Sequence, residues 1–175
     1  SDLDTGRVPR DRSARHPMSI PASLVFVCAG NICRSPMAEV LFRHLVQSHP
    51  ALEQLAVGSA GTIALSGNLP SADAVDVMRH QFGLEMAAHR ARPLTRRLDA
   101  DLVLTLDRET EREAKALRLN PPVEMLGDYV GTGEEVEDPY GRSTRHFRRV
   151  AVQLKRLVEL VVARLDAAAA ATSGP

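Results

Sequence analysis

The sequence predicts an α/β fold in which helices cover both faces of a parallel sheet. Residues 24–27 and 102–106 are short apolar runs without alternation, and such runs are typical of parallel strands buried on both sides. Weaker strand patterns occur at residues 55–59 and 124–126. Helical patterns lie between and after these strands, and this alternation favours a single α/β sandwich domain.

Three segments carry apolar residues at helical spacing. The first, at residues 38–45, follows the first strand directly, and the second lies at residues 75–82. The third is the clearest and runs from Phe147 to Leu165. Before it, residues 128–142 (DYVGTGEEVEDPYGR) hold three glycines and a proline, so we expect a long loop there. Loops of this length in compact domains are often functional.

The composition is that of a globular protein with one core. The chain has 175 residues, of which 44% are hydrophobic, and 22 basic residues balance 22 acidic ones. This balance gives no sign of a nucleic-acid or membrane partner. The predicted organisation is a disordered N-terminal tail at residues 1–22, a folded domain at 23–166 and a C-terminal tail at 167–175 that begins as a fraying helix end.

The chain has two cysteines, Cys28 and Cys33. Two cysteines make no disulfide framework, and they are too few for a structural zinc site. We therefore expect reduced thiols and a cytoplasmic location, with no metal or other cofactor.

Residues 27–39 read VCAGNICRSPMAE and place a thiol at the end of the first predicted strand. The small residues that follow Cys28 permit a tight turn. Ser35 suits the N-cap of the next helix and Pro36 its first position. Successive N–H groups of such a loop can converge on an anion, and the helix dipole adds positive potential. The segment therefore predicts a binding loop for a dianionic phosphoryl group.

The same segment suggests nucleophilic chemistry. The positive potential favours the thiolate form of Cys28, and Arg34 is placed to clamp two phosphoryl oxygens. The thiolate can then attack phosphorus while the loop amides stabilise the charge, without a metal. Asp138, in the flexible loop ahead of the last helix, is the candidate proton donor, although an aspartate before proline is by itself more often a turn residue.

These residues carry a resemblance to a known family. VCAGNICRSPMAE resembles the phosphate-binding loop of the low-molecular-weight protein tyrosine phosphatases, and EDPYG at residues 137–141 resembles their acid loop. GSAGT, AAHRARPLT and ADLVLTLD are further matches, and the resemblance runs from about Leu24 to about Leu165. It implies a single three-layer α/β domain whose four-stranded parallel sheet is flanked by helices, with the phosphate-binding loop between the first strand and the first helix.

The resemblance also implies roles for individual residues. Cys28 forms a phosphocysteine intermediate, Arg34 holds the phosphate, and Asp138 protonates the leaving group and then activates water. The implied phosphate-binding residues are Ala29, Gly30, Asn31, Ile32, Cys33 and Arg34, and the residues that support the loop are Asn31, Ser35, Ser59 and His89. Cys33 either forms a reversible disulfide with Cys28 under oxidation or only fills space, and both readings stay open.

The leaving group is phosphotyrosine or phosphoarginine. An aliphatic residue such as Ile32 resembles the tyrosine-specific members, whereas the bacterial protein arginine phosphatases of the family carry threonine at this position. Residues 63–68 contain no aromatic side chain, so Tyr140 is expected to be the wall against the substrate ring together with Ile32. The acid-loop region, in contrast, resembles the arginine-phosphatase branch, which remains the alternative.

The expected partners are phosphoprotein substrates, with inorganic phosphate and other oxyanions as inhibitors. Two other readings are less favoured. A thioredoxin-coupled arsenate reductase would need cysteines beyond Cys33, and none follows it. A non-catalytic phosphoprotein-binding module would have no need to retain Cys28, Arg34 and Asp138 together.

Overall fold

The computed structural model describes residues 20–174, and its centre is a four-stranded sheet in the order β2-β1-β3-β4. All three pairs of neighbouring strands are parallel. The predicted fold class is confirmed, and each expected strand is present within two residues of its predicted bounds. The strands are β1 (Ser23–Cys28), β2 (Ala56–Gly61), β3 (Leu102–Thr105) and β4 (Val123–Met125).

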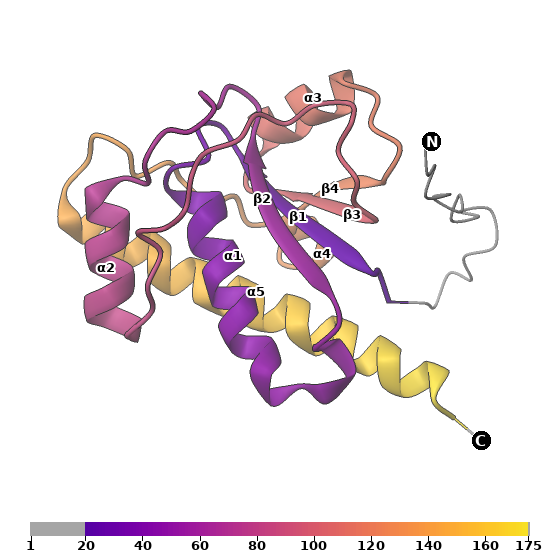
Figure 1. Ribbon diagram of the computed structural model, residues 1–175. Coiled ribbons are helices and arrows are strands. Elements are labelled where there is room, and N and C mark those ends of the chain that lie inside the picture. Colours follow the sequence, from indigo (N-terminus) through magenta and orange to yellow (C-terminus); the bar gives the residue numbers. More distant parts are fainter. Residues whose placement is uncertain (1–19, 175) are drawn as a thin grey trace, which may run out of the picture.

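Helices cover both faces of this sheet (Figure 1). The long helix α5 packs with α1 and α2 on one face, while α3 lies on the other. No helix within residues 20–174 combines the length and the apolarity that a bilayer crossing requires. The helices are α1 (Arg34–Leu45), α2 (Ala72–Phe82), α3 (Arg108–Ala116), α4 (Leu126–Tyr129) and α5 (Thr144–Thr172), with single 3₁₀ turns η1 (Val46–Ser48) and η2 (Pro50–Leu52).

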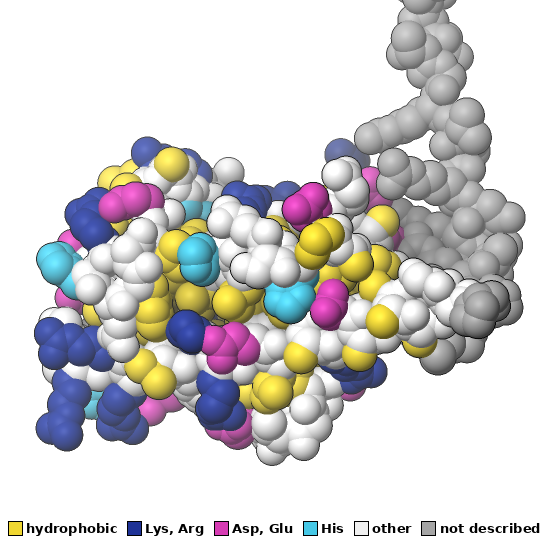
Figure 2. All heavy atoms as spheres, turned by 90° about the horizontal axis from the view of Figure 1, so that it is seen from below, with side chains coloured by type: hydrophobic (Ala, Val, Ile, Leu, Met, Phe, Trp, Pro, Cys, Tyr) yellow, Lys and Arg dark blue, Asp and Glu magenta, His cyan; other side chains and the backbone are white. Residues whose placement is uncertain are grey.

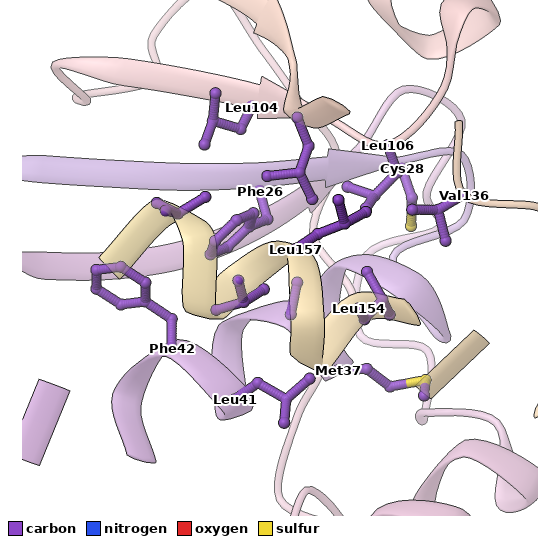
Figure 3. Close-up of a cluster of buried hydrophobic side chains, with 14 of the residues drawn as sticks. Phe26, Cys28, Met37, Leu41, Phe42, Leu104, Leu106, Val136, Leu154 and Leu157 are labelled. Carbon is purple, nitrogen blue, oxygen red and sulfur yellow. The ribbon is translucent and has the colours of Figure 1, made fainter. Parts of the chain in front are cut away.

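Strand β1 divides the core because its side chains alternate between the two faces. Leu24 and Phe26 belong to the larger apolar cluster with α1 and α5, and Phe26 meets Phe42 edge-on with ring centroids 6.0 Å apart. Val25 and Val27 point the other way, into a smaller cluster. Cys28 continues the first set, and Figure 3 shows it among the buried side chains of the larger cluster.

The strand order fixes where a ligand site can form. The chain passes from β1 outward to β2 and then returns across β1 to β3 on its other side. The segments that follow β1 and β3 therefore leave the sheet in opposite directions and open a crevice at its carboxyl edge. Cys28 ends β1, and Asp107 follows β3 by two residues, so both lie at this crevice.

Helix α3 was not expected from the sequence. Its residues, RETEREAKA, carry almost no apolar stripe, so hydrophobic spacing could not reveal it. The helix starts because the Asp107 carboxylate accepts a hydrogen bond from the Thr110 N–H at 2.8 Å. Ala114 is its main buried apolar anchor against the sheet.

The ends of the domain differ from the predicted boundaries. Helix α5 continues past residue 166 to Thr172, and Ala169 is buried against the core, so the start of the expected C-terminal tail is packed helix. The expected N-terminal tail, residues 1–22, lies outside the described residues except for 20–22. Within that short piece, Ile20 packs against the core and the Ala22 N–H donates to Asp101 at 2.8 Å.

Candidate active site

The loop between β1 and α1 begins at Cys28, whose thiol is buried. Ser35 was expected to cap α1, but the helix already begins at Arg34 with Cys33 in the cap position and no side-chain cap hydrogen bond. Ser35 consequently lies inside the first turn, where its hydroxyl turns back toward the loop. The Ser35 Oγ atom is 2.9 Å from Cys28 Sγ.

The surrounding segments take up the carbonyl groups of this loop. Thr62 N–H donates to the Cys28 carbonyl and Ile63 N–H to the Ala29 carbonyl, both at 3.0 Å, while Ser71 N–H donates to the Ile32 carbonyl at 2.9 Å. Within the described chain, no backbone N–H of residues 29–33 donates a hydrogen bond. These loop carbonyls are thus hydrogen-bonded to the protein, while the loop N–H groups remain available to an anion. This is the arrangement of an anion-binding nest.

Asn31 holds the loop in this shape. It is fully buried and has a left-handed backbone with φ of 55°, which asparagine tolerates better than most residues. Its side-chain amide donates to Ser35 Oγ at 2.8 Å and Ser59 Oγ at 2.9 Å, and its side-chain oxygen accepts from the Arg92 N–H at 2.9 Å. His89 Nε2 lies 2.7 Å from the Asn31 carbonyl. A carbonyl only accepts, so Nε2 carries the proton.

These hydrogen bonds also orient the Ser35 proton. Because Ser35 Oγ accepts from Asn31, its own hydrogen must point elsewhere. The two available acceptors are Cys28 Sγ at 2.9 Å and the Ala60 carbonyl at 3.4 Å. The shorter contact favours donation from the Ser35 hydroxyl to sulfur.

A close approach at Gly61 locks β2 against the loop. A Cβ atom at this position would lie 2.3 Å from the Ala29 carbonyl oxygen and 2.9 Å from the Asn31 nitrogen. Both of these are backbone atoms that cannot move without reshaping the loop. Glycine is therefore required at residue 61 by space, although its φ is not left-handed.

Arg34 is buried and is anchored by one edge of its guanidinium. Nη1 donates to Asp107 Oδ2 at 2.5 Å and to the Val136 carbonyl at 2.8 Å, while Nη2 lies 3.7 Å from Asp138 Oδ2. Nε makes no hydrogen bond within residues 20–174. The edge formed by Nε and Nη2 is thus available for two oxygens of an anion, as a bidentate clamp needs.

The charges around Arg34 shift the protonation equilibria. Burial lowers the pKa of Arg34, but Cys28 and Asp107 outweigh that effect and the net pKa is raised. Burial likewise raises the pKa of Asp107, yet the hydrogen bonds from Arg34 and Thr110 lower it below its usual range. Both groups therefore stay ionised at neutral pH.

The base of the segment that carries Asp138 is held to the rest of the fold by hydrogen bonds and an ion pair. Val136 N–H donates to the Leu106 carbonyl at 2.8 Å, and Glu134 pairs with Arg156 at 2.6 Å. The Arg108 N–H donates to the Glu135 carboxylate at 2.7 Å. Asp138 itself follows this base and is half exposed.

A pocket of about 220 Å³ brings the predicted residues together. Cys28, Arg34 and Asp138 line it, and so does Tyr140, 66% of whose surface is exposed. The supporting residues Asn31, Ser35, Ser59 and His89 lie outside the pocket and hold the loop from behind. Within residues 20–174, no group of His, Cys, Asp or Glu side chains is arranged to hold a metal ion.

Sequence reasoning missed three residues of this site. Asp107 anchors Arg34, the Arg92 N–H holds Asn31, and the exposed Ile63 adds an apolar wall to the pocket. Each stands inside or beside a motif that was recognised, but none of these motifs reveals which neighbour its residue contacts.

Cys33 is buried beside the pocket as a free thiol. Burial, with smaller contributions from Cys28 and Asp138, raises the pKa of Cys33 to about 12. Its thiol is therefore protonated at neutral pH and is not a competing nucleophile.

Comparisons with known proteins agree with this geometry. The family model described as low molecular weight phosphotyrosine protein phosphatase matches residues 23–171. The probable low molecular weight protein-tyrosine-phosphatase EpsP of Ralstonia solanacearum is 36% identical over 83% of this chain and 97% of its own length. A solved low molecular weight protein tyrosine phosphatase from T. tengcongensis has a TM-score of 0.74 at 31% identity, covering 82% of this chain and 99% of its own.

A second solved structure belongs to a protein with another substrate in its name. A YwlE arginine phosphatase, in a mutant with a phosphorylated active site serine, has a TM-score of 0.75 at 30% identity. The match covers 82% of this chain and 95% of that protein. Backbone similarity therefore does not separate the two kinds of phosphatase.

The Asp107–Arg34 pair predicts a specific dependence of stability on pH. Because the folded pKa of Asp107 is lowered, its contribution is present above the unfolded pKa of about 3.9 and is lost as the pH falls through the folded value. We expect Asp107→Asn to lower the unfolding free energy by about 1 to 3 kcal/mol at pH 6. This difference should shrink below pH 4 in urea titrations.

Asparagine can keep the cap of α3 through its one side-chain oxygen, so the variant removes the charge and the acceptor for Arg34 while sparing the helix start. Glu53→Gln, at an exposed site, serves as the control and should leave the pH profile unchanged. A loss that stays constant down to pH 2 would show that Asp107 is not the titrating group.

Proposed function

This chain belongs to the low molecular weight phosphotyrosine protein phosphatase family, and we propose that it hydrolyses phosphotyrosine in proteins through a phosphocysteine intermediate on Cys28. The observation that carries this proposal is the position of Cys28 Sγ. It lies beside the Ser35 hydroxyl, at the start of a loop whose N–H groups are unused, in a pocket shared with Arg34 and Asp138.

In the first step, the Cys28 thiolate attacks phosphorus and the bond from phosphorus to the tyrosine oxygen breaks. The loop N–H groups and the free edge of Arg34 bind the phosphoryl oxygens, whose charge spreads in the transition state. Asp138 gives its proton to the departing oxygen. Arg34 Nη2 lies 3.7 Å from Asp138, so the acid is close to the bound phosphoryl group.

In the second step, water attacks the phosphocysteine and the thiolate leaves. Asp138, now ionised, takes a proton from that water. The Ser35 hydroxyl donates to the departing sulfur and lowers the energy of the thiolate. The products are inorganic phosphate and the free enzyme. Because the loop binds tetrahedral oxyanions, we propose that phosphate and related oxyanions are competitive inhibitors.

The pocket walls favour an aromatic leaving group. Ile32, Ile63 and Tyr140 line the pocket around Cys28, and these side chains suit the faces of a phenyl ring. Among residues 20–174, Asp138 is the one carboxylate that lines it, so a guanidinium group meets a single anionic side chain from this part of the chain. The alternative is a protein arginine phosphatase, and the structural similarity to YwlE supports it.

The nucleophile must stay reduced to act. Cys28 and Cys33 are both free thiols. We therefore propose that the protein works in a reducing compartment, which is the cytoplasm.

The deciding experiment compares kcat/KM for one peptide that carries either phosphotyrosine or phosphoarginine, under reducing conditions. We expect at least about tenfold preference for phosphotyrosine, since apolar walls discriminate by roughly 1 to 3 kcal/mol. Cys28→Ser serves as the blank and should abolish turnover of both peptides. A preference for phosphoarginine would replace the main proposal by its alternative.

Asp138→Ala tests the proton donor. A phosphotyrosine peptide has a poor leaving group and should lose about 100- to 10,000-fold in kcat. An aryl phosphate with an activated leaving group needs less protonation, so its loss should be at least about tenfold smaller. Equal losses for both substrates would exclude Asp138 as the acid.

Cys33→Ala tests whether the second cysteine protects the first. Peroxide converts the Cys28 thiolate to sulfenic acid, and the Cys33 thiolate can displace hydroxide from it to form a disulfide. With a pKa of about 12 for Cys33, this closure should quicken about tenfold per pH unit between pH 7 and 9. Activity recovered by dithiothreitol should rise with pH in the unmodified protein but not in Cys33→Ala. Equal recovery would leave Cys33 as a packing residue.

A further inference from the structure

The first turns of α5 carry a concentration of unbalanced positive charge. Arg145, Arg148 and Arg149 are exposed, and none of them forms an ion pair with any residue from 20 to 174. Figure 2 views the molecule from below and shows basic side chains gathered at its left end. This is the end at which α5 begins in Figure 1. This end of α5 directly follows the acid loop.

This arrangement opposes the stability of the helix. Arg145 has Arg148 and Arg149 three and four residues ahead, so like charges are neighbours on the helix surface. Positive charge near a helix N-terminus is also unfavourable for the macrodipole, and the first turn holds no acidic residue to offset it. Arg79 and Arg108, on other helices, each pair with a carboxylate. A cluster of arginines that destabilises the start of α5 suggests that these side chains bind a partner.

A groove beside the cluster separates the acid loop from α5. It has a volume of about 480 Å³, and Arg148 and Arg149 line it together with Val152, which is 52% exposed. Glu137 of the acid loop and Glu134, which precedes that loop, also line the groove.

Those two carboxylates do not balance the free arginines. Glu134 already pairs with Arg156 at 2.6 Å, and Glu137 pairs with Arg142 at 3.2 Å. The free charge along the groove is therefore positive, and it suits an anionic occupant with an apolar portion over Val152.

The groove lies directly across the acid loop from the reaction pocket. Glu137 lines the groove and Asp138 lines the pocket. Neighbouring Cα atoms are about 3.8 Å apart, so the two cavities share one thin wall. The pocket of about 220 Å³ and the groove of about 480 Å³ are each roughly 6 to 8 Å across, so with the wall between them their centres lie on the order of 10 to 15 Å apart. At about 3.3 Å per residue, an extended peptide spans that separation in roughly three to five residues.

We propose that Arg148 and Arg149, with Arg145 beside them, form a docking site for acidic residues of the phosphoprotein substrate, three to five residues from the phosphotyrosine. This inference rests on the proposed function, since it assumes a peptide anchored in the pocket. The positive groove attracts the acidic segment and holds it next to the reaction site. Phosphate chemistry itself does not involve these residues.

The test uses two phosphotyrosine peptides that differ only in flanking Glu or Gln residues at three to five positions from the phosphotyrosine, on either side. Affinity is measured on Cys28→Ser, which binds without turnover, and kcat/KM on the active enzyme. We expect roughly a five- to twentyfold preference for the Glu peptide at low salt, most of it lost at 0.5 M NaCl.

The double variant Arg148→Glu/Arg149→Glu should abolish this preference and leave hydrolysis of 4-nitrophenyl phosphate unchanged. Arg96→Glu/Arg97→Glu is the matched control, because these exposed arginines lie between Leu94 and Leu98, which pack on the other face of the sheet. It changes the net charge equally and should keep the preference. If the glutamate pair fails to fold, Arg148→Gln/Arg149→Gln replaces it.

The proposal is overturned if the unmodified protein shows no preference or if both double variants lose it equally. Cosedimentation with phosphatidylserine vesicles tests whether the arginine cluster binds an anionic membrane surface instead of a peptide. Vesicle binding that the Arg148/Arg149 variant loses, without any peptide preference, would assign the cluster to a membrane surface and overturn peptide docking. If 4-nitrophenyl phosphate is not hydrolysed, the proposed function fails, while peptide affinities on Cys28→Ser still report on docking.

Discussion

The buried side chain of Asn31 is the constraint on which the rest of the site depends. The side-chain amide joins the loop to Ser35 of α1 and Ser59 of β2, and the side-chain oxygen joins it to the Arg92 N–H. The backbone carbonyl of the same residue meets His89. Because Asn31 is left-handed, the peptide groups around it turn their carbonyls into the protein. The same residue sets the direction of the Ser35 hydrogen and thereby the environment of Cys28.

Arg34 extends this order to the opposite side of the crevice. One edge of its guanidinium joins the segment after β3, through Asp107, to the base of the acid loop, through the Val136 carbonyl. Three segments that are distant in sequence are thus positioned by one buried cation. Without its anionic neighbours this cation would be costly to bury, so the ionisation of Asp107 and the placement of Arg34 depend on each other.

The sequence was sufficient for the fold class and for most residues that meet in the pocket, because buried parallel strands and a thiol-to-arginine loop leave clear local patterns. The exposed wall residue Ile63 was missed. The sequence was insufficient for contacts between side chains that only the order of the strands in the sheet brings together. Asp107 lies two residues beyond β3, and only the adjacency of β1 and β3 brings it to Arg34. Helix α3 was missed for a different reason: it is polar and has no apolar stripe, so its sequence shows no hydrophobic periodicity. Ser35 was mistaken for the N-cap of α1 because serine is a common cap residue, whereas its hydroxyl contacts Cys28 in the preceding loop.

The hydrogen bonds of the loop also bear on how such an enzyme can evolve. Ile32 and Ile63 take part in them only through backbone atoms: the Ile32 carbonyl accepts from Ser71 and the Ile63 N–H donates to Ala29. Almost any residue type supplies those atoms, so natural selection is free to exchange these two side chains while the reaction chemistry stays intact. The pocket wall can thus vary without disturbing the hydrogen bonds of the loop, and solved phosphatases named for tyrosine and for arginine both have backbones similar to that of this chain.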